Sequence, residues 1–313
     1  MVYFSVRRGR HIRQRGNHGL ARKMQFKKVS SAILGLISVL YSTNAMASYA
    51  RDWQMGFQEA ATAVMRDIND FHNLLLIIIT LITVFVLALL IYTMWRFSAK
   101  RNPTPSKTTH HTALEMIWTV VPVVILVVIA VPSFKLLYFS DVVPKADMTI
   151  KATGYQWYWS YEYPDHGNAS LDANVVDLRD PEMSTEDRKM WKAKFGDDYK
   201  RLLDTDNSLV VPVNTTIRVQ VTAGDVLHSW AVPAFGVKTD GVPGRLNETW
   251  FKAEKIGTYY GQCSELCGAR HGFMPIRVDV VSKPDFEKWV KKQVADAGKS
   301  SSPTVATLIN QNR

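Results

Sequence analysis

Both cysteines of this 313-residue chain lie in one short stretch, YYGQCSELCGARHGFMPI, which covers residues 259–276. Cys263 and Cys267 are followed by His271 and Met274, at intervals of four, four and three residues. Two thiolates, an imidazole and a thioether on one loop form the soft ligand set that copper electron-transfer sites use. The spacing therefore predicts a copper site that transfers electrons.

Other uses of two cysteines fit this stretch less well. A disulfide is the ordinary state of cysteines in an exported domain, but here it would close a very small ring and leave His271 and Met274 unexplained. A structural zinc site usually takes four Cys or His ligands without methionine. Covalent haem attachment needs C-x-x-C-H, whereas here the second cysteine comes one residue late and Gly268 follows it. Copper is favoured over these alternatives.

The number of thiols bears on the number of metal ions. A mononuclear blue-copper site uses one cysteine and two histidines, so a second thiolate would be surplus. Two thiolates that bridge two coppers would use both cysteines, and each copper would then need its own imidazole. The segment AGDVLHSWAVP (residues 223–233) supplies a candidate second imidazole, His228, at the end of a strand-like run.

Short strand-like segments dominate the chain from residue 141 onward. Two of them, TIRVQVTA and PIRVDVV, alternate apolar and polar residues as half-buried strands do. MTIKATGYQWYWSYEY and TWFKAEK are further β-type segments. About seven to ten strands at short spacing predict a β-sandwich or a Greek-key barrel.

Two segments of this domain are typical of helices. STEDRKMWKAKFG predicts a surface helix with Ser184 as N-cap and a stop at Gly196, inside an insertion of about 35 residues. KPDFEKWVKKQVADAG predicts a last amphipathic helix, and a polar tail that we expect to be disordered follows Ser300.

Two earlier runs are long enough to span a membrane. NLLLIIITLITVFVLALLIYTMW (residues 73–95) and MIWTVVPVVILVVIAVPSF (residues 116–134) contain no charged residue and approach or exceed the roughly 20 residues that a spanning helix requires. Their connection holds four basic residues and one acid, Glu115. The positive-inside rule therefore places the connection in the cytoplasm and the rest of the chain outside.

The N-terminal region has the pattern of a secretory signal. Its first 28 residues hold nine Lys or Arg and no acid, so they supply nine of the ten units of net positive charge. The net charge is therefore no evidence for a nucleic-acid partner, and we expect none. SSAILGLISVLYSTNAMA follows, with a short apolar core and small residues at Ala45 and Ala47. We expect cleavage before Ser48. Met24 is an alternative start of the chain, and a third membrane helix is the less favoured interpretation because the apolar run is short.

These motifs, taken in order, resemble the second subunit of haem-copper cytochrome c oxidases of the bacterial type close to the mitochondrial one. The resemblance covers about residues 65–290, through GYQWYWSYEY, DVLHSWAVP, KTDGVPGRLNE and GQCSELCGARHGFMPI. It implies a two-helix transmembrane hairpin followed by an all-β, cupredoxin-like Greek-key sandwich that holds a dinuclear copper A centre.

The segments described above, together with the resemblance, predict a domain organisation. The predicted parts are a signal peptide with a basic extension (1–47), an exported segment (48–71), the transmembrane hairpin (72–140), the copper A domain (141–298, with an insertion at about 170–205) and a C-terminal tail (299–313). The insertion and the long N-terminus depart from the family pattern, and neither touches the copper loop.

The resemblance assigns a role to each metal-binding position. Cys263 and Cys267 would bridge the coppers, and His228 and His271 would be the terminal ligands. Met274 and the backbone carbonyl of Glu265 would be weak axial ligands. The Glu265 carboxylate would reach a magnesium ion shared with the large catalytic subunit.

Residues outside the copper loop receive roles in the same way. Trp157, with Tyr158 beside it, would be the exposed ring through which electrons arrive, although a strand with buried rings is the plainer interpretation of this aromatic run. Glu162, Asp206 and Asp225 would line the docking face for basic cytochrome c, although acids are usually only a solvated surface.

Glu115 has two interpretations. It would be the mouth of a proton channel that continues in the large subunit, or a helix-start carboxylate favoured by the dipole.

The function implied is that of the subunit through which electrons enter a respiratory oxidase in the bacterial inner membrane, with a periplasmic copper domain. Subunits I and III, cytochrome c and the lipid bilayer would be its partners, and catalysis would belong to the complex. The copper A domain of a nitrous oxide reductase is an alternative, but the two membrane helices argue against it. A redox-inactive anchor, as in quinol oxidases, is disfavoured because every copper ligand is present.

Overall fold

The computed structural model describes residues 48–300. The predicted signal peptide (1–47) and the tail after Ser300 lie outside the described residues. Within them the chain forms two long helices, then ten strands with a short helix between β3 and β4, and a last helix.

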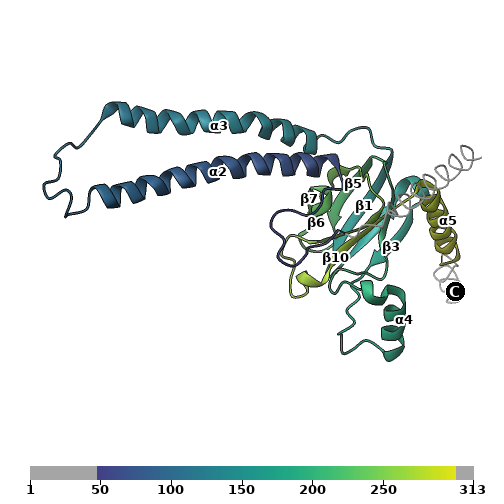
Figure 1. Cartoon of the computed structure of the whole chain (residues 1–313). Helices are drawn as coiled ribbons and strands as arrows, with labels where there is room; N and C mark the ends of the chain where they lie inside the picture. The colour runs from purple at the N-terminus through teal and green to yellow at the C-terminus, as the bar shows by residue number, and fades with distance from the viewer. Residues whose placement is uncertain (1–47, 301–313) are drawn as a thin grey trace, which may run out of the picture. The chain divides into compact units, whose positions relative to one another are not determined.

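The two long helices contain the two charge-free runs. Helices α2 (Ala63–Arg96) and α3 (Thr112–Asp141) run side by side and are long and apolar enough to cross a membrane (Figure 1). Apolar side chains are exposed all around both helices, as on helices that face lipid. The predicted hairpin is therefore confirmed.

Helix α2 begins nine residues before the predicted boundary at residue 72. Thr62 is its N-cap, because its side chain accepts a hydrogen bond from the backbone N–H of Met65. The first turns carry Arg66, Asp67 and Asp70, so the charge-free run marks only the part of the helix suited to the bilayer.

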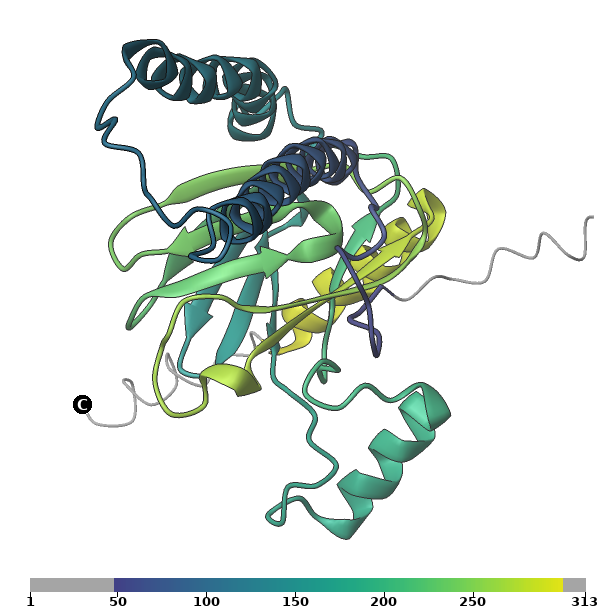
Figure 2. The same cartoon turned by 60° about the vertical axis from the view of Figure 1, so that its left-hand side comes forward.

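Ten strands form two five-stranded sheets that enclose a common hydrophobic core (Figure 2). The first sheet has the order β3-β2-β1-β5-β8 and the second β4-β10-β9-β6-β7. The strands are β1 (Met148–Tyr155), β2 (Tyr158–Tyr163), β3 (Ala169–Ala173), β4 (Leu209–Pro212), β5 (Ile217–Ala223), β6 (His228–Val232), β7 (Val237–Gly241), β8 (Asn247–Phe251), β9 (Gly257–Cys263) and β10 (Pro275–Val281). The predicted sandwich is confirmed, with crossover pairs β1–β5 and β4–β10 that are parallel.

The aromatic segment 148–163 is a hairpin rather than one strand. β1 and β2 pair antiparallel up to Tyr155 and Tyr158, so Gln156 and Trp157 form the turn between them. Trp159 and Tyr161, on β2, are fully buried in the core. The turn residues are thereby left at the end of the sheet, where they can contact the loops of the second sheet.

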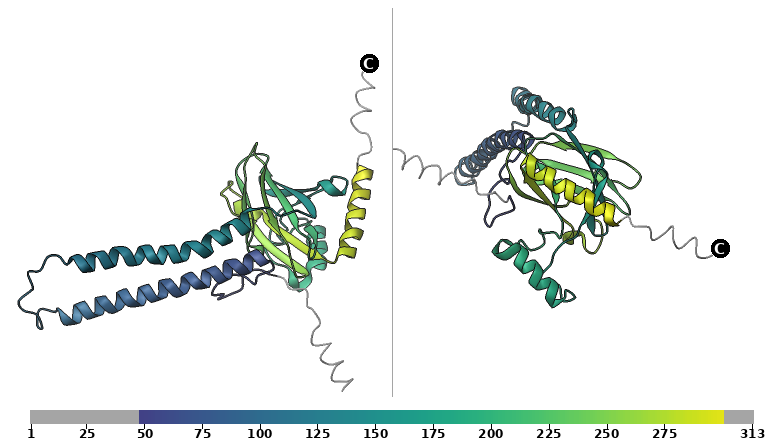
Figure 3. Two further views of the ribbon diagram at one scale, coloured as in Figure 1. Left: turned by 90° about the horizontal axis from the view of Figure 1, so that it is seen from above. Right: turned by 90° about the vertical axis from the view of Figure 1, so that its right-hand side faces the viewer.

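Both predicted helices of the sandwich domain are confirmed. Helix α4 (Thr185–Phe195) has Ser184 as N-cap and Gly196 as C-cap. Helix α5 (Lys283–Ser300) lies against the sandwich (Figure 3). Its Phe286 is buried beside the Tyr163 ring.

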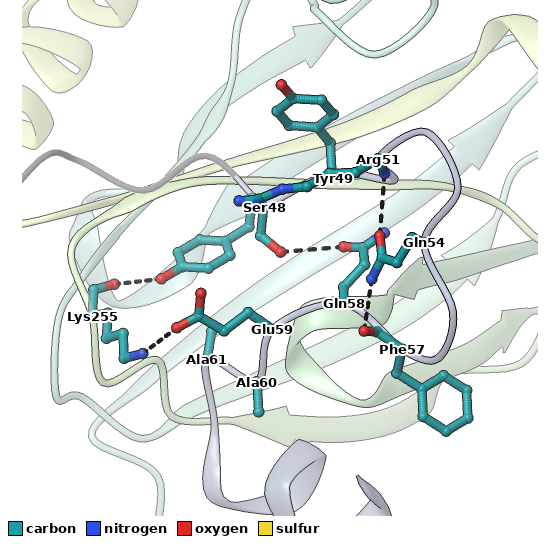
Figure 4. Close-up of a pocket in the computed structure, with 11 residues that line it drawn as sticks. Ser48, Tyr49, Arg51, Gln54, Phe57, Gln58, Glu59, Ala60, Ala61 and Lys255 are labelled. Atoms are coloured by element: carbon teal, nitrogen blue, oxygen red, sulfur yellow. Dashed lines mark hydrogen bonds and ion pairs between the residues drawn. The ribbon is translucent and has the colours of Figure 1, made fainter.

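The segment before α2 is fastened to the second sheet. Ser48 donates its N–H to the carbonyl of Thr258 and accepts from the N–H of Tyr260, which adds it to the edge of β9. A cavity of about 320 Å³ lies under this segment, and the ion pair of Glu59 with Lys255 lines it (Figure 4). None of the predicted copper ligands lines this cavity.

Candidate metal centre

Three adjacent strands of the second sheet bring the predicted ligands together. β9 ends at Cys263, and β6 begins at His228. These two strands are antiparallel neighbours, with Trp230 opposite Cys263. β10 starts directly after Met274, so the loop of residues 264–274 closes over the ends of all three strands.

The donor atoms of this cluster face one another. The ligand atoms of His228, Cys263 and Cys267 all lie within 4.8 Å of one another. The two Sγ atoms are 3.9 Å apart, and both cysteines are free thiols. His228 Nδ1 lies 3.8 Å from Cys263 Sγ, and His271 Nδ1 lies 3.4 Å from Cys267 Sγ. Each sulfur therefore has its own imidazole.

Two weaker donors complete the set. Met274 Sδ lies 3.4 Å from Cys267 Sγ, and the carbonyl oxygen of Glu265 lies 3.4 Å from Cys263 Sγ. His228 and Met274 are fully buried, and both cysteines are at most 3% exposed. The donors are two thiols, two imidazoles, a thioether and a carbonyl, which fits copper better than a hard cation.

The two thiols differ in acidity. Burial raises the pKa of Cys263, but the His228 imidazole and backbone groups around the sulfur outweigh it and lower the pKa below its ordinary value. Burial and the charge of Cys263 raise the pKa of Cys267 well above its ordinary value. Burial lowers the pKa of His228, while Cys263 and Asp225 raise it above its ordinary value overall. A metal ion that binds both sulfurs must therefore displace protons from the cluster.

Asp225 holds the far side of the His228 ring. Its Oδ1 lies 2.8 Å from His228 Nε2 and accepts the N–H of Val226, while Oδ2 accepts the N–H of Gln156. Burial raises the pKa of Asp225, but these hydrogen bonds lower it below its ordinary value overall. With Nε2 directed to a carboxylate, Nδ1 is the nitrogen left for a metal, the arrangement typical of metal-ligating histidines.

The aromatic pair of the β1–β2 hairpin lies beside the cluster. Trp157 is half-buried rather than fully exposed, because its ring packs against the core and its Nε1 donates to the carbonyl of Cys267 at 3.2 Å. Tyr158 stacks on Tyr155 with ring centroids 5.1 Å apart. Trp157 therefore contacts the cysteine loop, whereas Tyr158, the next residue in the sequence, packs on Tyr155 instead.

The predicted docking acids all have partners of their own. Glu162 pairs with Lys151 at 2.8 Å across β1 and β2. Asp206 accepts from the backbone N–H of Asn174 and of Asn207. Only Asp225 contacts a predicted metal ligand.

The two remaining predicted residues have separate surroundings. The Glu265 side chain belongs to the cysteine loop and is exposed. Glu115 lies in the first turn of α3, where its carboxylate accepts from the backbone N–H of His111 at 3.3 Å.

Sequence reasoning missed two residues that shape the site. A Cβ at Gly154 on β1 would lie 2.7 Å from His228 Cγ, so only glycine leaves room for the imidazole. Gln156 donates its side-chain N–H to the Cys267 carbonyl at 2.8 Å. A glycine inside a strand often marks a close approach of another group, which was a usable signal for Gly154, whereas the sequence carried no signal for Gln156.

Family models match most of the chain. The model described as "Cytochrome C oxidase subunit II, periplasmic domain" matches residues 148–281. The model described as "Cytochrome C oxidase subunit II, transmembrane domain" matches residues 50–136. The two matches contain the sandwich strands and most of the two long helices.

Known relatives agree with these models. The probable cytochrome c oxidase subunit 2 of Rickettsia bellii is 49% identical over 89% of this chain and 98% of its own length. Cytochrome c oxidase subunit 2 of Oenothera berteroana is 47% identical over 80% of this chain and 94% of its own. A crystal structure of the periplasmic domain of subunit II of cytochrome oxidase from Bradyrhizobium japonicum is 52% identical, covering 50% of this chain and 99% of that one, with a TM-score of 0.42. The chain belongs to the cytochrome c oxidase subunit II family.

Proposed function

We propose that this chain is the subunit through which electrons enter a respiratory cytochrome c oxidase. It accepts electrons from cytochrome c at a dinuclear copper A centre and passes them to a haem of catalytic subunit I, where dioxygen is reduced to water with proton pumping. The observation that carries this proposal is the buried pair of free thiols 3.9 Å apart, each with an imidazole Nδ1 within 3.8 Å of its sulfur.

The donor atoms suggest how the metal ions would be held. The thiolates of Cys263 and Cys267 and the imidazoles of His228 and His271 would hold them. The thioether of Met274 and the carbonyl of Glu265 would be weaker donors at the same site, since each lies 3.4 Å from a cysteine sulfur. A copper pair held there would supply one-electron chemistry, with the change in charge shared between two metals.

The protein's own contribution is a rigid, dry frame. His228 and Cys263 lie at the ends of the paired strands β6 and β9 and are buried, so the sheet fixes their positions, whereas Cys267, His271 and Met274 lie on the loop between β9 and β10. Groups that cannot rearrange keep the structural cost of gaining or losing an electron small. Hydrogen bonds to the ligands then tune the potential.

Electrons would arrive through Trp157, with Tyr158 beside it. The indole of Trp157 donates to the carbonyl of Cys267, which supports a direct connection between this ring and a bridging ligand. Glu162, Asp206 and Asp225 would attract basic cytochrome c, because complementary charge raises the association rate in a salt-dependent way.

Two further roles concern the complex. The exposed Glu265 carboxylate would bind magnesium at the boundary with subunit I. Glu115 would admit protons from the cytoplasm. The complex, with subunits I and III, would lie in the bacterial inner membrane and carry the sandwich in the periplasm.

Reduction by cytochrome c tests this function. In the purified oxidase complex, mixing with reduced cytochrome c should bleach the visible absorption of the copper centre before the haem of subunit I is reduced. Cys263→Ser should abolish that absorption and the fast haem reduction together. Fast haem reduction in Cys263→Ser would refute the proposed path.

A further inference from the structure

The predicted metal ligands lie on or directly beside two loops that are far apart in the sequence. One loop, between β5 and β6, holds Asp225 and leads into His228, and the other, between β9 and β10, holds Cys267. A third element, the β1–β2 turn at Gln156 and Trp157, touches both loops. This turn contains none of the predicted metal ligands.

On one side the turn holds the histidine loop. The backbone N–H of Gln156 donates to Asp225 Oδ2 at 2.7 Å, and the other oxygen of Asp225 lies 2.8 Å from His228 Nε2. The turn is therefore linked to a predicted ligand through a single carboxylate. This hydrogen bond comes from the main chain, so any residue except proline at position 156 can form it.

On the other side the turn holds the cysteine loop. The side-chain N–H of Gln156 donates to the carbonyl of Cys267 at 2.8 Å, and Trp157 Nε1 donates to the same carbonyl at 3.2 Å. A carbonyl oxygen has two lone pairs, so the two donors satisfy it completely. These two hydrogen bonds come from the side chains of the turn.

The next residue of the cysteine loop leaves room for this contact. Gly268 has φ +118°, and a Cβ there would lie 3.0 Å from Gln156 Nε2 and 3.2 Å from the Trp157 ring. A side chain at position 268 would crowd both donors away from the carbonyl of Cys267. Gly268 thus leaves the space in which Gln156 and Trp157 reach the carbonyl of Cys267.

We propose that Gln156 is a positioning residue that ties the two ligand loops of the copper centre together. The inference rests on the proposed function, because the loops matter as metal-binding loops. Gln156 is an exposed residue beside the docking face, so a direct contact with cytochrome c is the competing role. The two roles can be separated because a residue that holds the loops together affects the metal site even when cytochrome c is absent.

Two variants of equal side-chain length separate these roles. Gln156→Met and Gln156→Glu both lose the N–H donor, and only Gln156→Glu adds a negative charge that basic cytochrome c would attract. Gln220→Met is the matched control, since Gln220 also donates from its side chain, to Glu248 at 2.9 Å, on the exposed surface of β5. The copper-loaded full-length chain in detergent is mixed with a strong copper chelator and the rate of copper loss is recorded.

Both Gln156 variants should lose copper about three- to tenfold faster than wild type, the effect of one hydrogen bond, whereas Gln220→Met should match wild type. In the metal-free chain, both should also raise the alkylation rate of Cys267. Unchanged copper loss and unchanged alkylation in both variants would overturn the proposal, and a change only in the KM for cytochrome c would assign Gln156 to docking. A wild-type chain that binds no copper would refute the proposed function, while the alkylation rates would still decide whether Gln156 ties the loops.

Discussion

The carboxylate of Asp225 lies 2.8 Å from Nε2 of His228, on the side of the ring opposite to the cysteines. The imidazole is fully buried, whereas the carboxylate is 32% exposed. Asp225 thus links the solvent-facing surface to a predicted copper ligand. A residue assigned only to docking would not need this contact.

Replacing Asp225 tests the two roles of this carboxylate. Asp225→Asn should weaken copper binding by about 10- to 100-fold, the usual effect of removing an outer-shell partner of a metal ligand. Asparagine keeps one acceptor oxygen, but its NH2 group cannot accept, so at least one of the three hydrogen bonds of Asp225 is lost. Because this loss is local rather than that of a long-range attraction, it should persist at high salt. Copper titration of the full-length chain at low and high ionic strength measures both.

Glu162→Gln is the control for charge alone. Glu162 pairs with Lys151 and has no hydrogen bond to a predicted ligand. Its neutralisation should raise the KM for cytochrome c at low salt and leave copper affinity unchanged. Equal copper affinity in Asp225→Asn and wild type would show that Asp225 serves docking alone.

Gly154 predicts a steric effect on His228. In Gly154→Ala the new Cβ would lie 2.7 Å from His228 Cγ, and both residues are buried. We expect a loss of about 1–3 kcal/mol in the free energy of unfolding, as for other overpacked cores, together with weaker copper binding. Thermal and chemical unfolding of the metal-free chain gives the first quantity.

A second glycine provides the matched control. Gly272 follows the predicted ligand His271, yet no heavy atom beyond its two chain neighbours lies within 4 Å of the Cβ that alanine would add. Gly272→Ala should therefore retain stability and copper affinity. Equal effects at both positions would contradict the steric explanation.

Trp157 offers a test that separates its ring from its N–H group. Trp157→Phe keeps an aromatic ring but removes the hydrogen bond to the Cys267 carbonyl, and Trp157→Leu removes both. Electron arrival from cytochrome c should be slowed in both variants, and more in Trp157→Leu. Stopped-flow reduction of the purified complex measures the rate, and an unchanged rate in Trp157→Leu would remove the assignment.

Glu115 can be changed without removing its structural contact. Glu115→Gln keeps an oxygen able to accept the N–H of His111, so the start of α3 stays capped while the ionisable group is lost. If the carboxylate admits protons, turnover and proton pumping of the reconstituted complex should both fall. If Glu115→Gln keeps wild-type turnover and only Glu115→Ala loses it, Glu115 serves to cap the helix rather than to admit protons.

The sequence predicted much of the donor cluster because four of its side chains lie within twelve consecutive residues, from Cys263 to Met274. Their types and spacing carry the chemistry without any knowledge of the fold. His228 was a weaker candidate, since its closeness to Cys263 depends on the pairing of β6 with β9. The hydrophobic pattern gives the strands but not which strands become neighbours.

The contacts of Gln156 could not be predicted in this way. Its two partners, Asp225 and Cys267, are 69 and 111 residues away along the chain. The aromatic run also concealed the turn, because Tyr155, Trp157, Tyr158 and Trp159 all favour strands. Hydropathy likewise marks only the part of α2 that suits lipid, whereas the Thr62 cap sets where the helix begins.

In the proposed centre, two copper ions share one unpaired electron across the sulfurs of Cys263 and Cys267. Electron paramagnetic resonance of the copper-loaded full-length chain, with copper content measured on the same sample, decides whether they do. We expect two coppers per chain and a seven-line hyperfine pattern, which Cys267→Ser should abolish. One copper per chain with a four-line pattern, or thiols that are covalently linked in the working complex, would contradict it.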